Sequence, residues 1–248
     1  YSGPRYSARQ WGDQTAEKAV AWLQKTPDRH FLWYHSYDAH GPWTRWGNDC
    51  AEYATDPEKL LVLEKIPKYQ RVETCIDPEE YKKRYAQAVQ FADANVGLIL
   101  DELKRQDRYD DALIVVMSDH GERFTERELW FDHGTSAHEE QLHVPLIVKY
   151  PRNKRSGTID RRLVSLLDIA PTLTSEANLR PMPKSRGRSL TDRSYDGAEV
   201  LFGESSHCKK EKVLTCSPYG PEGKEFSLRS DSTAVLLKGA EAVQYDRT

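Results

Sequence analysis

Apolar residues recur at helical spacing in two stretches of the chain. Between residues 78 and 106 they form one stripe with steps of three or four positions, through Tyr85, Val89, Ala92, Val96, Ile99 and Leu103. The stripe predicts a long helix with one buried face, and Pro78 followed by two glutamates is typical of a first turn. A shorter helix is predicted over 14–25 by the same spacing. Asp168 as a cap, with Pro171 in the first turn, predicts the start of a third helix.

Other stretches have the length and composition of strands. Residues 112–117 and 144–149 are nearly unbroken apolar runs, which are typical of strands covered on both faces. Residues 31–37 form an aromatic run that ends in a turn sequence. Weaker candidates lie at 163–167, 199–202 and 234–237. Helices that alternate with such strands predict an α/β fold with a mostly parallel sheet sandwiched by helices, followed by a smaller C-terminal region of strands and helix.

The composition is that of a globular chain with a large polar surface. Of the 248 residues, 38% are hydrophobic and 30% are charged, the formal net charge is -3, and the mean hydropathy is -0.76. This near balance of charge gives no electrostatic footprint of a nucleic-acid partner. No apolar run approaches the roughly 18 residues of a membrane-spanning helix. We therefore expect neither nucleic-acid binding nor a membrane span.

Four cysteines fall into two loose pairs, Cys50 with Cys75 and Cys208 with Cys216, and none has the spacing of a zinc or redox motif. The first pair lies in residues 44–77, a polar and irregular stretch that predicts a long loop. Two disulfides would place the chain in an oxidising compartment. Four reduced thiols fit the spacing equally well.

Two predicted strands end in side chains that can carry chemistry. Asp119 and His120 follow the strand at 112–117, and His40 follows the aromatic run. In sheets of this kind, ligands bind beyond the carboxyl ends of the strands. Asp119 and His120 can share a divalent cation, and His40 can donate a proton to a leaving group. Taken singly, a polar strand end and a hydrogen-bonded loop histidine are the alternatives.

Three further histidines, His133, His138 and His143, recur every five residues. This spacing does not place two imidazoles on one helical face, as the zinc motif HExxH does. His133, in a loop with Gly134, is the best site candidate of the three. We expect structural roles for His138 and His143.

Five segments resemble, in order, the C-terminal part of a sulfatase of the alkaline-phosphatase superfamily. The resemblance covers roughly residues 14 to 246 and is carried by FLWYHSYDAHGPW, YAQAVQFADANVGLILDEL, DDALIVVMSDHGE, FDHGTSAHEEQLHVPLIVKYP and VSLLDIAPTL. It implies an alkaline-phosphatase-like fold for the predicted α/β layers. Within that fold, residues 1–160 would belong to the catalytic domain, and 161–248 to its remainder and a C-terminal subdomain.

The resemblance also implies roles for individual residues. Asp119 and His120 match the pair that binds the active-site divalent cation, which would be calcium, with magnesium or manganese as alternatives. His40 matches the histidine that contacts the ester and helps its leaving group depart. His133 lies where many sulfatases place a lysine on the sulfate. Many sulfatases have Asn at the position of His120, and Asp-His also occurs in phosphonate and phosphodiester hydrolases of the superfamily.

The front half of the family's active site has no counterpart in this sequence. In the family, a strand with two acidic metal ligands precedes a Cys- or Ser-x-Pro-x-Arg segment, whose first residue becomes the formylglycine nucleophile. Cys216-Ser217-Pro218 is a poor match, because Gly220 stands where arginine is required. We therefore expect the chain to be the C-terminal portion of an enzyme, inactive without its N-terminal half.

The resemblance implies a metal-dependent sulfuric-ester hydrolase that acts on a small-molecule or saccharide sulfate ester. One alternative is a phosphodiester or phosphonate hydrolase, or a phosphotransferase, of the same superfamily. A second is a non-catalytic sulfatase-like binding module. The paired cysteines and the habit of the family favour a location outside the cytoplasm.

Overall fold

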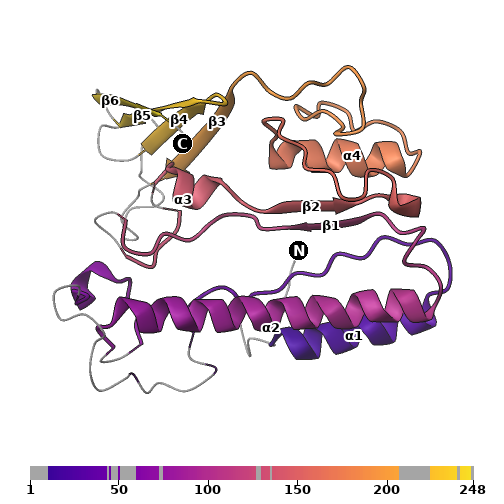
Figure 1. Ribbon diagram of the computed structural model, residues 1–248, viewed down its shortest axis with the longest axis horizontal. Helices are drawn as coiled ribbons and strands as arrows, with labels where there is room; N and C mark the ends of the chain where they lie inside the picture. Colours follow the sequence, from indigo (N-terminus) through magenta and orange to yellow (C-terminus); the bar gives the residue numbers. More distant parts are fainter. Residues whose placement is uncertain are drawn as a thin grey trace. The chain divides into compact units, whose positions relative to one another are not determined.

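The computed structural model describes residues 11–43, 45, 50, 60–72, 75–126, 130–134, 136–206, 224–238 and 241–246 (Figure 1). The chain forms two compact units. The first consists of residues 1–111 with 124–131, and the second of residues 112–123 with 132–248. In the described part of the chain, no helix is long and apolar enough to cross a membrane. The division expected near residue 160 stays a prediction.

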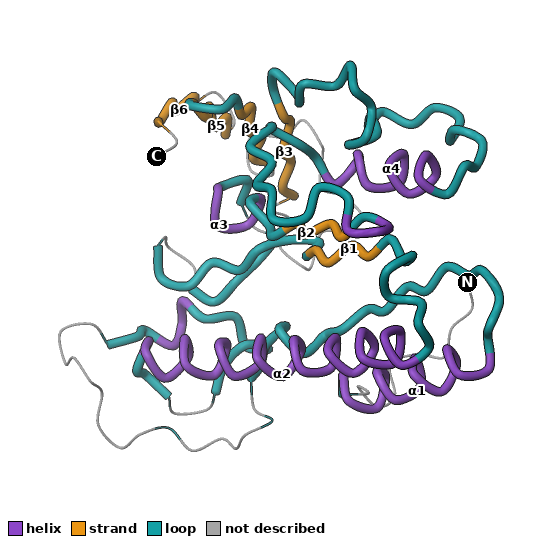
Figure 2. The backbone as a smooth tube through the Cα atoms, turned by 45° about the vertical axis from the view of Figure 1, so that its right-hand side comes forward, coloured by secondary structure: helices purple, strands orange, loops and turns teal. Residues whose placement is uncertain are grey.

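Two helices form the frame of the first unit. Helix α1 (Gly12–Lys25) and helix α2 (Pro78–Arg105) confirm the two predicted helices. Asp77 caps α2, because its carboxylate accepts a hydrogen bond from the Glu79 N–H at 2.9 Å, and Pro78 occupies the first turn. The helices lie side by side in both ribbon and tube views (Figures 1 and 2). A small core joins them through Ala16, Ala19, Leu23 and Ile99.

The strand predicted at 31–37 is wrong, because this segment forms no strand. Its side chains nevertheless alternate between partly buried and exposed positions. Leu32 and Tyr34 pack on the core between α1 and α2, whereas Phe31, Trp33 and Tyr37 are 67%, 62% and 54% exposed. A strand requires backbone hydrogen bonds to a neighbouring strand, and within the described residues no strand pairs with this segment. The aromatic pattern therefore predicted the buried face, and it could not predict a pairing partner.

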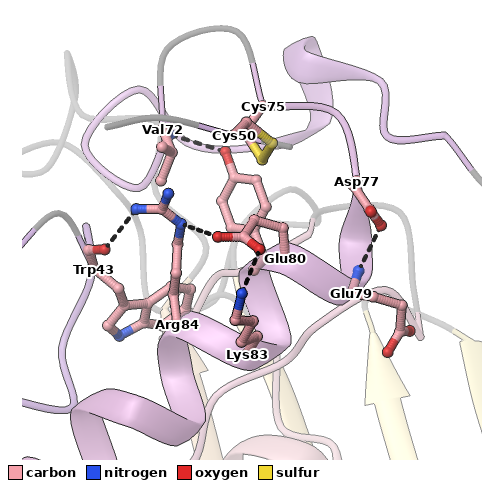
Figure 3. Close-up of a disulfide and its surroundings, with 10 residues drawn as sticks. Trp43, Cys50, Val72, Cys75, Asp77, Glu79, Glu80, Lys83 and Arg84 are labelled. Carbon is pink, nitrogen blue, oxygen red and sulfur yellow. Dashed lines mark hydrogen bonds and ion pairs between the residues drawn. A yellow bond between two sulfur atoms is a disulfide. The ribbon is translucent and has the colours of Figure 1, made fainter. Parts of the chain in front are cut away.

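A second core of the first unit gathers around Trp43, Tyr81 and Phe131, all of which are almost fully buried. Tyr81 and Phe131 stack with their centroids 4.4 Å apart, and Trp43 meets Phe131 edge-on. The disulfide between Cys50 and Cys75 adjoins this core (Figure 3). It settles the first of the two cysteine pairs in favour of a disulfide. Cys208 and Cys216 lie outside the described residues.

Arg84 ties helix α2 to the same core (Figure 3). Its Nε donates to Glu80 at 3.0 Å, and its Nη1 donates to the Trp43 carbonyl at 3.2 Å. The arginine side chain is buried, so pairing with a carboxylate and a carbonyl offsets the cost of removing its charge from water. The loop that follows His40 is thereby fixed to α2.

The second unit begins with a pair of strands. Strands β1 (Ile114–Met117) and β2 (Leu146–Lys149) confirm the two apolar runs as strands, and they pair antiparallel, with Ile114 opposite Lys149. One face of the pair packs on the segment around helix α4 (Ile169–Glu176). Every strand pair among the described residues is antiparallel, so the parallel part of the expected sheet is not seen there. An apolar run in the sequence predicts a buried strand, but it does not predict whether the neighbouring strand is parallel or antiparallel.

Asp168 organises the region before α4 in a way the sequence did not predict. Its carboxylate accepts hydrogen bonds from the Ser165 N–H at 3.0 Å, the Arg188 N–H at 2.8 Å and the Tyr195 hydroxyl at 2.9 Å. The side chain makes no capping bond to α4, which corrects the expectation that it caps that helix. Burial, together with donation to Asp168, raises the pKa of Tyr195 to about 12. Asp168 therefore joins three segments as a buried acceptor.

The second unit ends in a four-stranded antiparallel sheet with strands in chain order. Its members are β3 (Leu201–Ser206), β4 (Lys224–Arg229), β5 (Thr233–Lys238) and β6 (Glu241–Asp246). Two of the weaker strand candidates fall on β3 and β5, and the smaller C-terminal strand region is confirmed. The third, 163–167, is wrong, because it forms an irregular segment leading into a 3-10 turn at Leu166–Asp168.

Candidate functional site

The end of β1 carries the first candidate residues. Ser118, Asp119, His120 and Gly121 follow the strand directly. The Gly121 N–H donates to the Gln141 carbonyl at 2.8 Å, and a Cβ on Gly121 would collide with the Glu140 carbonyl. Only glycine therefore fits where this turn passes against helix α3 (Glu139–Leu142). The close approach fixes the direction in which the loop leaves the strand.

Asp119 and His120 fit a shared cation. Asp119 Oδ1 lies 3.7 Å from His120 Nε2, and both side chains face solvent. Two adjacent ligands of a cation about 2.3–2.6 Å away have a separation of this order. His120 Nδ1 lies 2.9 Å from the Gly121 carbonyl, which places the proton on Nδ1 and the lone pair on Nε2. Within the described residues, no group of three or more histidine, cysteine, aspartate or glutamate side chains could hold a metal ion.

His133 is held by an acid that the sequence analysis missed. Its Nδ1 lies 3.3 Å from Glu122 Oε2 and 3.4 Å from Oε1, and both side chains are largely buried. Hydrogen bonding to Glu122 raises the pKa of His133, and burial opposes it. Glu122 belongs to a run of charges that suggests only a solvated loop. The sequence signal that could have identified Glu122 is its position directly after Gly121, where the chain turns.

A short antiparallel bridge places Glu122 opposite His133. Arg123 and Asp132 exchange both backbone hydrogen bonds, each at 3.2 Å, so their neighbours lie across from one another. Their side chains also form a buried ion pair, with Arg123 Nη2 3.3 Å from Asp132 Oδ2. The bridge thus positions the Glu122–His133 contact through the backbone.

His133 also stacks on His120. The two rings are 4.3 Å apart between centroids with an angle of 23°. Three of the four predicted site residues, Asp119, His120 and His133, therefore come together in the second unit, and Glu122 joins them. The arrangement combines two side chains that could bind a cation with an adjacent imidazole that can carry a positive charge.

The C-terminal sheet forms hydrogen bonds to the loop that carries His133. Ser205 donates to the Gly134 carbonyl at 2.9 Å. The Ala137 N–H donates to Glu225 at 3.1 Å, and Arg229 donates to the Ala137 carbonyl at 2.7 Å. Strands β3 and β4 thus bind the backbone of Gly134 and Ala137, so the C-terminal region helps to position the candidate site.

The fourth predicted residue, His40, belongs to the first unit. Its Nδ1 lies 2.6 Å from the Gly41 carbonyl, and its ring faces Tyr69 at 5.9 Å between centroids. A Cβ on Gly41 would meet the end of the Gln70 side chain, which would have to move to admit it. Two residues earlier, buried Asp38 anchors the loop.

Asp38 accepts three hydrogen bonds. The donors are the Gly12 N–H at 2.9 Å, Ser36 Oγ at 2.7 Å and Asn95 Nδ2 at 3.4 Å. Both helices of the unit therefore hold the start of the His40 loop. Asp38, the aspartate of the Asp-x-His segment, therefore has a structural role: it fixes the loop that carries His40.

The other two histidines of the five-residue series lie at the ends of α3. His138 occupies the position before its first residue and stacks on Tyr245, with ring centroids 6.1 Å apart. His143 follows its last residue and is strongly exposed beside Glu139. Neither of them joins the Asp119–His120–His133 group.

Most of the chain matches a known protein family. A family model described as Sulfatase matches residues 2–179. The chain belongs to the sulfatase family. The matched residues include His40, Asp119, His120 and His133. Membership confirms the resemblance read from the five sequence segments, and proteins of this family generally depend on a divalent metal ion.

Related sulfatases are longer than this chain. A protein of Formosa agariphila named Sulfatase is 30% identical over 180 residues, which is 68% of this chain and 35% of that protein. An endo-4-O-sulfatase of Bacteroides thetaiotaomicron is 26% identical over 251 residues, which is 95% of this chain and 49% of that protein. The chain therefore spans between a third and a half of the length of these curated relatives.

The fold is shared as well. The solved structure of a 2-O GAG sulfatase superposes with a TM-score of 0.67 at 18% identity, covering 99% of this chain and 58% of that one. A likeness at this identity speaks for the fold alone. It places the helices and antiparallel sheets described above in an α/β architecture of the sulfatase type.

Proposed function

We propose that the complete protein is a metal-dependent sulfuric-ester hydrolase and that this chain supplies one part of its active site. The observation that carries the proposal is the convergence of Asp119, His120 and His133 at the end of β1, within a chain of the sulfatase family. Family membership alone would leave the chemistry open, because one fold hosts several reactions.

Asp119 and His120 are the residues that would hold the cation. Calcium is our first choice, with magnesium and manganese as alternatives, and when bound it would neutralise charge on the sulfate oxygens. A hard cation takes about six or more oxygen-rich ligands. We propose that the remaining ligands and the formylglycine nucleophile come from an N-terminal half of the same enzyme.

His133 is proposed to bind an anionic oxygen of the ester. The contact of its Nδ1 with Glu122 orients the ring, and a protonated ring would donate from both nitrogens. His40 is proposed to donate a proton to the leaving oxygen, with its ring oriented by the contact between Nδ1 and the Gly41 carbonyl.

The complete fold is proposed to contain the mostly parallel sheet predicted from the sequence. Strand β1, whose apolar run is typical of a strand covered on both faces, would be one of its members. The α/β architecture of solved relatives supports the same arrangement.

The substrate is proposed to be a sulfated saccharide. Support comes from the endo-4-O-sulfatase among the relatives. The test compares turnover by the complete protein of a sulfated monosaccharide, an aryl sulfate, an aryl phosphate and an aryl phosphonate. We expect the sulfate esters to be hydrolysed with a higher kcat/KM than the phosphorus esters.

The outcome also decides between the alternatives. A preference for the phosphonate or phosphate ester would favour the related phosphorus chemistry, for which His120 in place of asparagine is the observation. No turnover of any ester by a folded complete protein that also binds no metal would favour a non-catalytic module. Either result would overturn the proposal.

A further inference from the structure

One segment of the second unit concentrates positive charge that the candidate site does not use. Residues 151–193 contain ten lysines and arginines but four aspartates and glutamates, a formal charge of +6 in a chain of net charge -3. Three of these acids do not oppose an incoming anion strongly. Asp168 is buried as an acceptor, and Asp160 and Asp192 are paired with Arg162 and Arg188. The exposed charge of this segment is therefore strongly positive.

Three arginines from separate stretches of the segment converge. Arg155 Nη1 and Arg162 Nη2 both donate to the Leu190 carbonyl, at 3.3 Å and 3.0 Å. The guanidinium groups of Arg162 and Arg188 lie 5.7 Å and 5.0 Å from the centre of the Tyr195 ring. These contacts fix the three guanidinium groups near one another on one surface.

Each of the three has an exposed basic neighbour in the sequence. Lys154, Arg161 and Arg186 are exposed, and within the described residues their side chains make no hydrogen bond or ion pair. Their charges are therefore available to a partner. We call the six residues together the arginine surface: Lys154, Arg155, Arg161, Arg162, Arg186 and Arg188.

The turn that starts this surface has an unusual backbone. Arg152, Asn153 and Arg155 have φ values of 56°, 52° and 60°. Left-handed conformations are uncommon for residues other than glycine, so these three residues set a specific backbone path for the turn.

The arginine surface is separate from the candidate site. Strands β1 and β2 are antiparallel, with Ile114 opposite Lys149. Asp119 follows the end of β1, whereas the turn at Pro151–Asn153 follows the end of β2, so the two features lie at opposite ends of the strand pair. The element order can be followed in Figure 1. A ligand on this surface would contact neither Asp119 nor His120.

We propose that the arginine surface binds a stretch of a sulfated polysaccharide at a distance from the ester that is hydrolysed. The inference rests on the proposed function, and it narrows the substrate class from a sulfated saccharide to a multiply sulfated polymer. Guanidinium groups match the oxygens of tetrahedral oxyanions with paired hydrogen bonds. Holding a polymer at a second place raises its effective concentration at the first.

Two other polyanions must be distinguished from the polysaccharide. Single-stranded nucleic acid is bound by exposed aromatic rings on which bases stack, but Tyr150 and Tyr195 beneath these arginines are buried. An anionic membrane would also suit exposed apolar side chains, and Ile159 is 80% exposed. The polysaccharide is favoured because the family acts on sulfate groups, and the membrane is left as an outcome of the test.

The test measures binding of a heparin dodecasaccharide to the full 248-residue chain by isothermal titration calorimetry. The variant combines Lys154→Gln, Arg161→Gln and Arg186→Gln, which remove charge without breaking a contact of the described structure. A basic residue beside an anionic surface contributes about a fivefold gain in affinity. We expect the triple variant to bind at least about tenfold more weakly, and binding by the wild type to weaken steadily as salt is added.

A matched control replaces three exposed lysines of the other unit, Lys25→Gln, Lys68→Gln and Lys83→Gln. The control should bind like the wild type, and desulfated heparin of the same length should bind at least tenfold more weakly than heparin. Equal losses in variant and control would overturn the proposal, because net charge would then suffice. Tighter binding to vesicles containing phosphatidylserine, or to single-stranded DNA, would overturn it in favour of that partner.

A second readout separates this proposal from the proposed function. In the complete protein, the triple variant should raise KM for a sulfated polymer and leave turnover of a small sulfate ester unchanged. If small esters are not hydrolysed but heparin binding depends on the arginine surface, the proposed function fails and the surface stands. If esters are hydrolysed and the variant binds heparin like the wild type, the surface fails and the function stands.

Discussion

The imidazole of His133 lies against the carboxylate of Glu122, with Nδ1 3.3 Å from Oε2. The backbone bridge between Arg123 and Asp132 sets the two residues opposite one another, and the ring of His120 covers one face of the imidazole. Glu122 therefore links the proposed cation ligands to the residue proposed to bind the ester. It acts through His133 and is a positioning residue.

Removing this carboxylate should impair catalysis through the histidine. We expect Glu122→Ala in the complete protein to lower kcat by about 10- to 100-fold, the usual effect of losing an acid that orients a functional histidine. The double variant with His133→Ala should lose no more activity than His133→Ala alone, because the two residues act as one unit. Steady-state kinetics of the two single variants and the double variant give the answer. Independent, multiplying losses would contradict the coupling.

Asp168 should be a stability residue without a catalytic role. Asparagine at this position keeps one acceptor oxygen for three donors, so buried hydrogen bonds of Ser165, Arg188 and Tyr195 are weakened or lost. We expect Asp168→Asn to lower the free energy of unfolding by about 1–3 kcal/mol, as for one buried polar group left unsatisfied. Chemical denaturation measures the effect. The exposed Asp196→Asn serves as the control and should change little; equal effects of the two substitutions would refute the role given to Asp168.

Glu102 on helix α2 should make the stability of the first unit depend on pH. Hydrogen bonds from Arg105 first, then from Gln106 and Gln24, lower the pKa of Glu102 from 4.5 to about 2. A lowered folded-state pKa contributes stability above the unfolded-state value, and this contribution disappears as the pH falls. Wild type should therefore be more stable than Glu102→Gln at pH 7, and the difference should shrink between pH 4.5 and about 2. Urea denaturation at several pH values measures it, and a difference that does not vary with pH would argue against this ionisation.

The C-terminal sheet should control the mobility of the His133 loop. Glu225 accepts from the Ala137 N–H, so Glu225→Ala removes one of the backbone hydrogen bonds that hold this loop. We expect faster hydrogen exchange in the peptide that covers residues 136–142, with unchanged exchange in α2. Unchanged exchange at Ala137 would show that Arg229 and Ser205 hold the loop without Glu225.

Part of the fold was predictable from the sequence because its signals are local. The stripe from Tyr85 to Leu103 predicted α2, and the apolar runs predicted β1 and β2. The segment 31–37 shows the limit of such signals. Its alternation marks a buried and an exposed face, but hydrogen-bonded pairing depends on a neighbour that the local sequence does not contain.

The candidate site was predictable only where residue type and position coincided. Asp119 and His120 could be predicted because they directly follow an apolar strand sequence. His133 could be predicted because Gly134 places it in a loop. Glu122 was missed because its run of charges resembles a solvated loop, and only the bridge between Arg123 and Asp132 brings it inward. Asp168 was taken for a helix cap because its three donors come from residues 165, 188 and 195, which the sequence alone does not bring together.

The most direct test of the proposed chemistry is sulfate-ester hydrolysis by the complete protein before and after removal of divalent metal with a chelator. Activity should be lost on chelation and restored by calcium, magnesium or manganese. Asp119→Ala should abolish that restoration, whereas the exposed Asp28→Asn should not affect it. Hydrolysis that survives both chelation and Asp119→Ala would contradict a metal-dependent site at the end of β1.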